Sequence, residues 1–205
     1  MGQKVNPFSF RLGPLFTWTS RWFASDKRYK DLLLEDVKLR TQLESRLKHA
    51  NLARVEIERS INRIDVTIYV SRPGVVIGRG GTGLEELKKF VQTLLSKKGN
   101  STQKVEIKIE PVKEPNLEAR IVAANIAEQL AKRLPHKRLV MQSIERVMGS
   151  GAKGVRIMLS GRIAGAEISR REKFQKGTVP LSTIRENIDY AQLPSLTKSG
   201  YIGVK

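Results

Sequence analysis

Residues 73–83 read Pro-Gly-Val-Val-Ile-Gly-Arg-Gly-Gly-Thr-Gly, a short apolar run followed by a glycine cluster. Residues 84–95 carry leucine and valine at helical spacing, so the cluster is predicted to open a helix. Glycines let a backbone approach a phosphate closely, and a helix start offers free N–H groups and the positive end of a dipole. This stretch decides the fold, because it fits two loops from different architectures.

The two loops differ in which glycines they use. Gly78, Gly80 and Gly83 fit G-x-G-x-x-G, the fingerprint of a dinucleotide-binding fold. Gly78 and Gly81 fit G-x-x-G, the loop with which a KH domain clamps a nucleic-acid backbone. Arg79, inside the loop, adds a cation to a phosphate clamp. A glycine-rich turn without any ligand is the third alternative.

The order of elements around the loop favours the KH alternative. Residues 26–49 are predicted to form a helix, and residues 54–70 form two alternating runs typical of an antiparallel hairpin. A further alternating strand follows at 105–110. A dinucleotide-binding fold begins with its fingerprint strand, whereas here a helix and a hairpin come first. The apolar residues predicted to share one face of the first helix are Leu33, Val37, Leu43 and Leu47.

The second half of the chain predicts another domain. Pro111 and Pro115 make a short linker, and a helix capped by Asn116 follows. A second helix over 136–148 and a strand over 155–159 come next. The predicted fold is α/β (α+β): an extended arm over 1–24, a type II KH domain over 25–110, and a C-terminal domain over 111–205 with two helices packed on a mixed or antiparallel sheet.

The composition points to a polyanionic partner. The chain has 205 residues with 38 Lys and Arg against 20 Asp and Glu, a formal net charge of +18 and a pI near 10.4. Such a surplus repels itself in a compact protein, which favours nucleic acid as the partner. The absence of cysteine excludes disulfides, thiolate zinc sites and cysteine nucleophiles, and two histidines exclude a multi-histidine metal site. No cofactor, metal, catalytic group or membrane span is expected.

Basic residues gather in three places. The arm interleaves aromatic and basic residues, and its aromatics either stack on RNA or pack on the domain behind them. Around the second C-terminal helix, a phosphate-binding track is weighed against a merely solubilising face; it comprises Lys132, Arg133, Lys137, Arg138 and Arg146. The residues expected to bind structured RNA are Lys4, Arg11, Lys153, Arg156, Arg162, Arg170, Arg171, Lys173, Lys176 and Arg185.

Three segments resemble one known family. Residues 1–13 are similar to the opening of ribosomal protein three of the small subunit, of the bacterial and organellar type. Residues 73–81 resemble that family's KH motif. Gly151-Ala152-Lys153-Gly154, Ser160-Gly161-Arg162 and the stretches 165–170 and 179–190 resemble its C-terminal signature.

The resemblance implies a function. Members of that family bind rRNA in the head of the small subunit and line the pore through which mRNA enters, on a bacterial cytoplasmic or an organellar ribosome. Their neighbours are small-subunit proteins ten and fourteen, with four and five near the pore. The family's basic pair at the pore falls on Lys137 and Arg138, and Met141 stands where another basic residue is frequent.

Two rival functions stay open at this stage. A KH-type RNA-binding factor that acts away from the ribosome is the first. A nicotinamide-dependent dehydrogenase that uses Gly78, Gly80 and Gly83 is the second. Saturable binding of the dinucleotide would distinguish the second from any RNA-binding protein.

Overall fold

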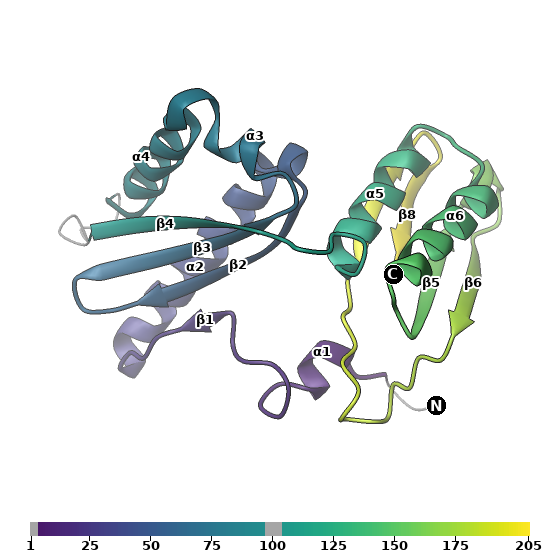
Figure 1. Ribbon diagram of the computed structural model, residues 1–205, viewed down its shortest axis with the longest axis horizontal. Coiled ribbons are helices and arrows are strands. Elements are labelled where there is room, and N and C mark those ends of the chain that lie inside the picture. Colours follow the sequence, from purple (N-terminus) through teal and green to yellow (C-terminus); the bar gives the residue numbers. More distant parts are fainter. Residues whose placement is uncertain (1–3, 97–103) are drawn as a thin grey trace. The chain divides into compact units, whose positions relative to one another are not determined.

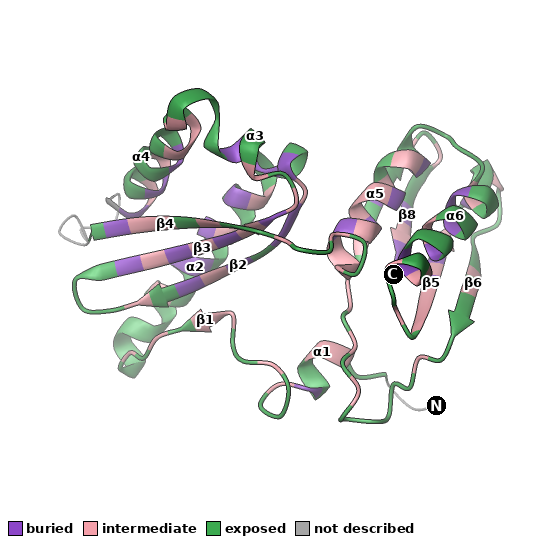
Figure 2. Cartoon of the chain, viewed as in Figure 1, coloured by how far each residue is buried: buried purple, intermediate pink, exposed green. Residues whose placement is uncertain are grey.

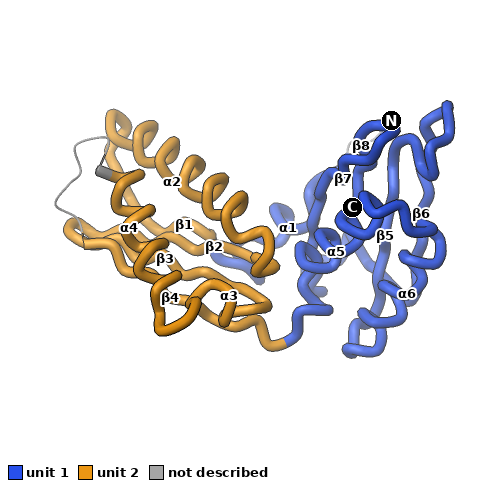
Figure 3. Tube along the Cα trace, turned by 90° about the horizontal axis from the view of Figure 1, so that it is seen from above, with its two compact units in different colours: residues 1–17, 114–205 blue, residues 18–113 orange. Residues whose placement is uncertain are grey.

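The computed structural model describes residues 4–96 and 104–205, so Met1–Gln3 of the predicted arm lie outside it. The chain forms two compact units, which Figure 3 shows in different colours. One unit is continuous and spans residues 18–113. The other combines residues 1–17 with residues 114–205, so the predicted arm is divided between the two.

The continuous unit, called the KH unit below, is a four-stranded sheet with its helices (Figure 1). Strands follow the order β1-β2-β3-β4, with β2 and β3 antiparallel and the other two pairs parallel. Its elements are β1 (Ser20–Arg21), α2 (Asp26–Arg46), β2 (Leu52–Arg59), β3 (Arg63–Val70), α3 (Pro73–Ile77), α4 (Thr82–Ser96) and β4 (Lys104–Pro111). The predicted order of helix, hairpin, glycine loop, helix and strand is confirmed.

The core of the KH unit lies between one sheet face and two helices. Alternate residues of β2 and β3, such as Ile57 and Val66, pack with leucines of α2 and α4. The predicted inner face of α2 is wrong for Leu33 and Val37, which are exposed. Leu43 and Leu47 are buried, as predicted, and Leu39 and Asp36 take the other buried positions. The sequence pattern missed this face because a buried carboxylate occupies one of its positions.

The discontinuous unit, called the C-terminal unit below, has two helices on a four-stranded antiparallel sheet, as predicted. Its strands follow the order β6-β5-β8-β7. Its elements are α1 (Pro7–Phe10), α5 (Ala119–Ala131), α6 (His136–Gly149), β5 (Gly154–Gly161), β6 (Arg170–Gly177), β7 (Leu193–Thr197) and β8 (Gly200–Val204). Figure 2 shows buried positions on the sides of α5 and α6 that face the sheet.

Arg11 joins the arm to the end of the chain. Its side chain is fully buried, and its guanidinium donates five hydrogen bonds, all to backbone carbonyl oxygens. One acceptor is in the arm, at Pro7, and the other four are far along the chain, at Pro180, Leu181, Thr183 and Glu186. The distances run from 2.7 to 3.2 Å. Loss of a hydrogen bond between a buried cation and a carbonyl oxygen costs free energy. Arg11 therefore fixes the path of the loop over 178–190, which supplies four of the five carbonyls.

The same loop supplies the cap of α5. The backbone N–H of Ala119 donates to Oδ2 of Asp189 at 2.6 Å, which places a carboxylate at the positive end of the helix. The predicted cap, Asn116, is therefore wrong, since its amide donates to Ser150 Oγ at 3.2 Å. A cap from a residue 70 positions away leaves no trace in the local sequence.

The second half of the arm is held to the KH unit by buried charges. Asp36 accepts from Arg59 at 2.6 Å, from the Trp22 indole at 2.8 Å and from Ser20 Oγ at 3.1 Å. Arg40 donates to the Thr19 carbonyl at 3.0 Å and to Ser20 at 2.7 Å. These contacts dock β1 beside β2. The described part of the predicted extended arm therefore follows the protein surface as α1, a turn and β1.

Replacing Arg11 tests its role in the C-terminal unit. R11M keeps an unbranched apolar stem and removes all five hydrogen bonds. We expect a loss of about 3 kcal/mol or more in the free energy of unfolding, because a fully buried cation loses five part-buried hydrogen bonds. Thermal unfolding and amide exchange over residues 178–190 measure it. R185Q, an exposed arginine of the same loop, is the control, and equal effects of the two changes would contradict the role given to Arg11.

Candidate nucleic-acid interface

The glycine loop joins α3 to α4 through left-handed backbone. Gly78, Gly80 and Gly81 have φ of 72°, 61° and 83°, a region that side-chain-bearing residues rarely adopt. Thr82 Oγ1 donates to the Arg79 carbonyl at 3.1 Å and closes the turn. The sequence therefore needs glycines here for the chain to turn sharply into α4.

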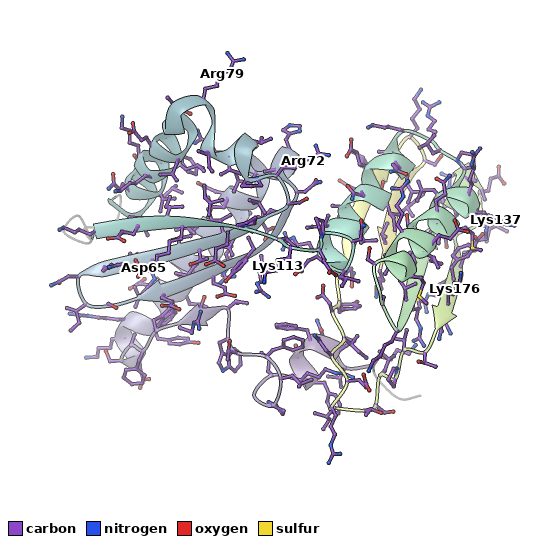
Figure 4. All side chains as sticks on the ribbon, in the orientation of Figure 1. Asp65, Arg72, Arg79, Lys113, Lys137 and Lys176 are labelled. Atoms are coloured by element: carbon purple, nitrogen blue, oxygen red, sulfur yellow. The ribbon has the colours of Figure 1, made fainter. Side chains whose placement is uncertain are left out.

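The outer side of this loop is open. A Cβ added at Gly80 or Gly81 would meet no atom within 4 Å, whereas one at Gly83 would lie 2.5 Å from the Val76 carbonyl oxygen. The inner glycine thus serves helix packing, and the outer ones leave the backbone accessible. Arg79 is exposed and points away from the fold (Figure 4). This arrangement suits a phosphate backbone that approaches the start of α4.

One cation beside the loop, Arg72, is not among the site residues that the sequence predicts. Arg72 is exposed and immediately precedes α3, and it is labelled in Figure 4. Val75 and Ile77, on α3, are also exposed, at 59% and 38%. The feature of the sequence that could have pointed to Arg72 is its position directly before Pro73, the first residue of the glycine-loop stretch. A cation and apolar side chains beside a backbone clamp fit phosphate and base, respectively.

A second group of cations lies on and before α6, and we call it the helix surface. All of its members are exposed, and they are the five predicted track residues Lys132, Arg133, Lys137, Arg138 and Arg146. Val140, Ile144 and Val147 face the core, as the helical spacing predicts, and Leu139 is buried with them. Arg138 and Arg146 are about 12 Å apart along the helix at 1.5 Å per residue. Met141, the departure from the family's pattern, is 51% exposed on the same helix.

The start of α6 is suited to an anion. Lys137 and Arg138 lie in its first turn, where the helix dipole is positive and cations are unfavourable. The first turn has no acidic residue, and the preceding Pro135 provides no side-chain cap. Among the described residues, no hydrogen bond or ion pair engages the side chains of Lys137 and Arg138. A bound phosphate would offset the repulsion between these cations and the positive end of the helix dipole, and it would accept hydrogen bonds from the free N–H groups.

A carboxylate stands next to this helix start. His136 Nε2 lies 3.0 Å from Glu172 Oε2, and Arg170 donates to the other oxygen of Glu172 at 2.7 Å. The hydrogen bond from Arg170 is the main cause that holds the pKa of Glu172 below its usual value, and the charge of His136 acts in the same direction. Glu172 therefore stays ionised at neutral pH and partly neutralises the charge of Arg170. Arg170, a predicted RNA contact, thus has less free charge to offer a phosphate.

A third group of cations lies on the sheet and is called the sheet surface. Ile157 and Leu159 of β5 pack toward the helices, so the alternating residues of β5 and β6 face the other way. Arg156, Arg171 and Lys173 are on this outer face, since Met158 pairs with Lys173 and Ser160 with Arg171. Lys176, labelled in Figure 4, pairs with Val155 and therefore lies on the other side of β6, where it is exposed and is not part of the sheet surface. The helix and sheet surfaces thus lie on opposite faces of the C-terminal unit.

Some of the other predicted RNA contacts have exposed charges, and others bind groups within the protein. Arg11 is fully buried and saturated by carbonyls, so its prediction as an RNA contact is corrected to a structural role. Lys153 pairs with Glu186 at 3.2 Å, Arg162 donates to the Ala166 carbonyl, and Lys132 pairs with Glu128, all in exposed places where such pairs are weak. Lys4 and Arg185 are exposed.

The arm's aromatic residues also divide. Phe8 and Phe16 stack on each other at 4.7 Å between ring centroids, and Trp22 is held by Asp36, so these rings pack within the protein. Trp18 and Phe23 are 69% and 97% exposed. Packing within the protein thus accounts for Phe8, Phe16 and Trp22, and stacking on RNA stays a prediction for the exposed Trp18 and Phe23.

Other kinds of site find no support. Within residues 4–96 and 104–205, no three His, Cys, Asp or Glu side chains come together as a metal site would require. Among those residues, no helix combines the length and apolar character needed to cross a bilayer.

Comparison with known proteins identifies both units. Residues 38–117 match the family described as KH domain, and residues 126–205 match Ribosomal protein S3, C-terminal domain. The small ribosomal subunit protein uS3 of Shouchella clausii is 46% identical over 205 residues, which are 100% of this chain and 90% of that relative. The uS3 protein of Bacillus cytotoxicus is 47% identical, with the same shares of both chains.

Reversing charge in the glycine loop tests the KH unit. R79D together with G80D is expected to weaken binding of a single-stranded RNA oligonucleotide about tenfold or more, because phosphates meet repulsion at the clamp. Asp tolerates the left-handed backbone of position 80 better than most residues, so the melting temperature should change little. Fluorescence anisotropy and circular dichroism measure the two effects. K88D with T93D, exposed on α4, changes the net charge equally, and a similar loss there would contradict a specific clamp.

Proposed function

Since the chain belongs to the uS3 family of small ribosomal subunit proteins, we propose that its cationic surfaces divide the RNA of the subunit between them. The protein is a structural, non-enzymatic constituent of the small subunit with an RNA-binding KH domain, and its partners are rRNA and other ribosomal components. The glycine loop lies inside the KH match, so the dehydrogenase alternative is wrong. The family also excludes the alternative of a factor away from the ribosome.

The helix surface takes mRNA at the pore through which the message enters. The observation that carries this proposal is the pair Lys137 and Arg138, two exposed cations in the first turn of α6 with no acidic residue beside them in that turn. Such a place attracts phosphates one after another without holding a base, which a moving strand requires. Arg146 extends the track along the helix and offsets the uncharged Met141.

The sheet surface and the arm bind rRNA. Arg156, Arg171 and Lys173 present guanidinium and ammonium groups from one rigid sheet face, which suits recognition of RNA shape and phosphates. Lys4, Lys153, Arg162, Lys176 and Arg185 add cations from the same unit. The glycine loop with Gly78, Arg79, Gly80 and Gly81 clamps an RNA backbone on the KH unit.

The neighbours of the protein follow from the resemblance to its family. We assign contacts with small-subunit proteins ten and fourteen, and with proteins four and five around the mRNA-entrance pore. Crosslinking within intact small subunits tests the assignment, and the absence of crosslinks to all four would contradict it.

Removing the pair at the helix surface should impair the passage of folded mRNA. K137A with R138A is expected to slow translation of a hairpin-containing message several-fold relative to an unstructured one, because fewer phosphates are drawn into the pore. Time courses of synthesis on ribosomes that carry the variant measure the ratio. K88A with K89A, exposed lysines of α4, is the control, and equal ratios for both variants would rule out a role for the pair.

Removing charge from the sheet surface should change the salt dependence of rRNA binding. The logarithm of the affinity falls linearly with the logarithm of salt concentration, and its slope counts the phosphates neutralised. R171Q with K173Q is expected to reduce the magnitude of that slope by about 1.5 to 2. Filter binding of small-subunit rRNA over a range of salt concentrations gives the slope. An unchanged slope would show that these cations do not touch phosphate.

A further inference from the structure

The strands of the C-terminal sheet place no acidic side chain on its outer face, within residues 104–205 that the structure describes throughout. Strands β5, β6, β7 and β8, labelled in Figure 3, contain one acid, Glu172. Glu172 pairs with Leu159 of the core and contacts His136 of α6, so it lies on the side that faces the helices. The charged side chains that the strands place on the outer face are therefore Arg156, Arg171 and Lys173.

Two large uncharged side chains share this face with the cations. Leu196 of β7 stands opposite Tyr201 of β8, and the two residues are 62% and 68% exposed. The neighbouring pair, Ser195 and Ile202, is buried on the helix side, which puts Leu196 and Tyr201 on the outer face. Side chains that stand opposite each other in this way are about 5 Å apart at Cβ. They therefore form one exposed patch, which is called the tyrosine patch below.

The Tyr201 ring is open to a ligand. Within the described part of the chain, no hydrogen bond, ion pair or ring contact engages its side chain. Gly203, two residues along β8 on the same face, adds no side chain, and a Cβ there would lie 2.9 Å from Ser160 Oγ. Gly203 stands opposite Ser160, and Ser160 stands opposite Arg171. The surface from the ring toward Arg171 is thus low, which leaves space for a flat base against the ring.

Three exposed cations border the tyrosine patch. Arg171 is two strands away from β8, at about 4.8 Å per strand, and its long side chain can reach across that distance. At the end of the sheet, a Cβ on Gly161 would lie 2.8 Å from the Tyr201 carbonyl oxygen, and the exposed Arg162 follows Gly161 directly. Lys198 is exposed in the turn that joins β7 to β8. Phosphates beside a base on Tyr201 would therefore meet positive charge.

We infer that the tyrosine patch is a stacking site for one unpaired RNA base, which lies on the Tyr201 ring with Leu196 beside it. The adjoining phosphates meet the cations Arg162, Arg171 and Lys198. This inference rests on the proposed binding of rRNA by the sheet surface, and it adds that the RNA has a base outside its helix at this point. Aromatic stacking accepts any base, so the site selects an exposed base in a bulge or loop and not a sequence.

The charge around the patch favours RNA over a protein as the ligand. An exposed apolar patch alone would suit either one. Here the bordering side chains are cations, and the strands add no acid to the face, which complements a phosphate chain. An aromatic ring on a sheet, with cations around it, is the arrangement by which proteins hold unpaired nucleotides.

Removing the ring tests the inference in the full chain. Y201A is expected to lower the affinity for small-subunit rRNA about fivefold or more, because one base loses its stacking partner. The slope of log affinity against log salt concentration should not change, since Tyr201 neutralises no phosphate. Y201F keeps the ring and should bind as tightly as the unchanged protein, whereas Y201L keeps only an apolar side chain and should behave as Y201A. Filter binding measures all four proteins, and Y29A, which removes a half-exposed tyrosine from the KH unit, is the control.

Ultraviolet crosslinking locates the stacked base directly. The complex of the unchanged protein with small-subunit rRNA is irradiated, digested with nuclease and trypsin, and analysed by mass spectrometry. We expect a nucleotide attached to Tyr201 in the tryptic peptide 199–205. The same peptide without a nucleotide, in a complex that crosslinks elsewhere, would contradict the inference.

The binding data separate failure of this inference from failure of the proposed function. Unchanged affinity of Y201A, while R171Q with K173Q still reduces the salt slope, would remove the stacked base and keep the rRNA contact. If R171Q with K173Q also left the slope unchanged, the sheet surface would not bind rRNA at all. Tight binding by Y201L, or an equal loss in Y29A, would show that no ring stacks on a base at position 201. Normal rRNA affinity of Y201A together with poor incorporation into small subunits would assign the tyrosine patch to a protein.

Discussion

The C-terminal unit depends on one buried guanidinium. Arg11 binds five backbone carbonyls, four of them in a loop that has no regular secondary structure of its own. That loop in turn provides the carboxylate that caps α5. Arg11, which its sequence context assigns to RNA binding, thus binds carbonyl oxygens inside the protein. The surface charge available for RNA lies elsewhere, on α6, on the outer sheet face and at the glycine loop.

The sequence was sufficient for the order of elements, because each depends on a local period. Alternation marks β2, β3, β4 and β5, and helical spacing marks α4 and the inner side of α6. Leu33 and Val37 were assigned wrongly to the inner face of α2 because Asp36 lies on the buried side, where it binds Arg59 and Trp22. The cap of α5 was missed because Asp189 is far away in the chain. Contacts of this kind follow from tertiary structure, which periodicity does not encode.

The part of the candidate site that consists of exposed, clustered cations could be predicted from the sequence. Runs of cations with few acids marked the helix surface, and all five residues are exposed. The same reasoning failed for Arg11, since a basic residue in a polar arm is indistinguishable by type from one that binds carbonyls. It also treated the cations over 152–190 as one group, whereas strand register places Arg171 and Lys173 on one face of the sheet and Arg170 and Lys176 on the other. Register depends on pairing partners, so only the structure separates these two sets.

The division of the chain has a consequence for how the protein is made. Residues 1–17 are synthesised long before the loop over 178–190, because four of the carbonyls that Arg11 binds lie up to 175 residues later. The KH unit is contiguous, so it can complete its fold while the remainder is still being synthesised. Until the loop over 178–190 has been made, Arg11 has only the Pro7 carbonyl as a partner. The C-terminal unit therefore depends on contacts of long sequence separation, which are entropically costly to close and are typical of slow folding.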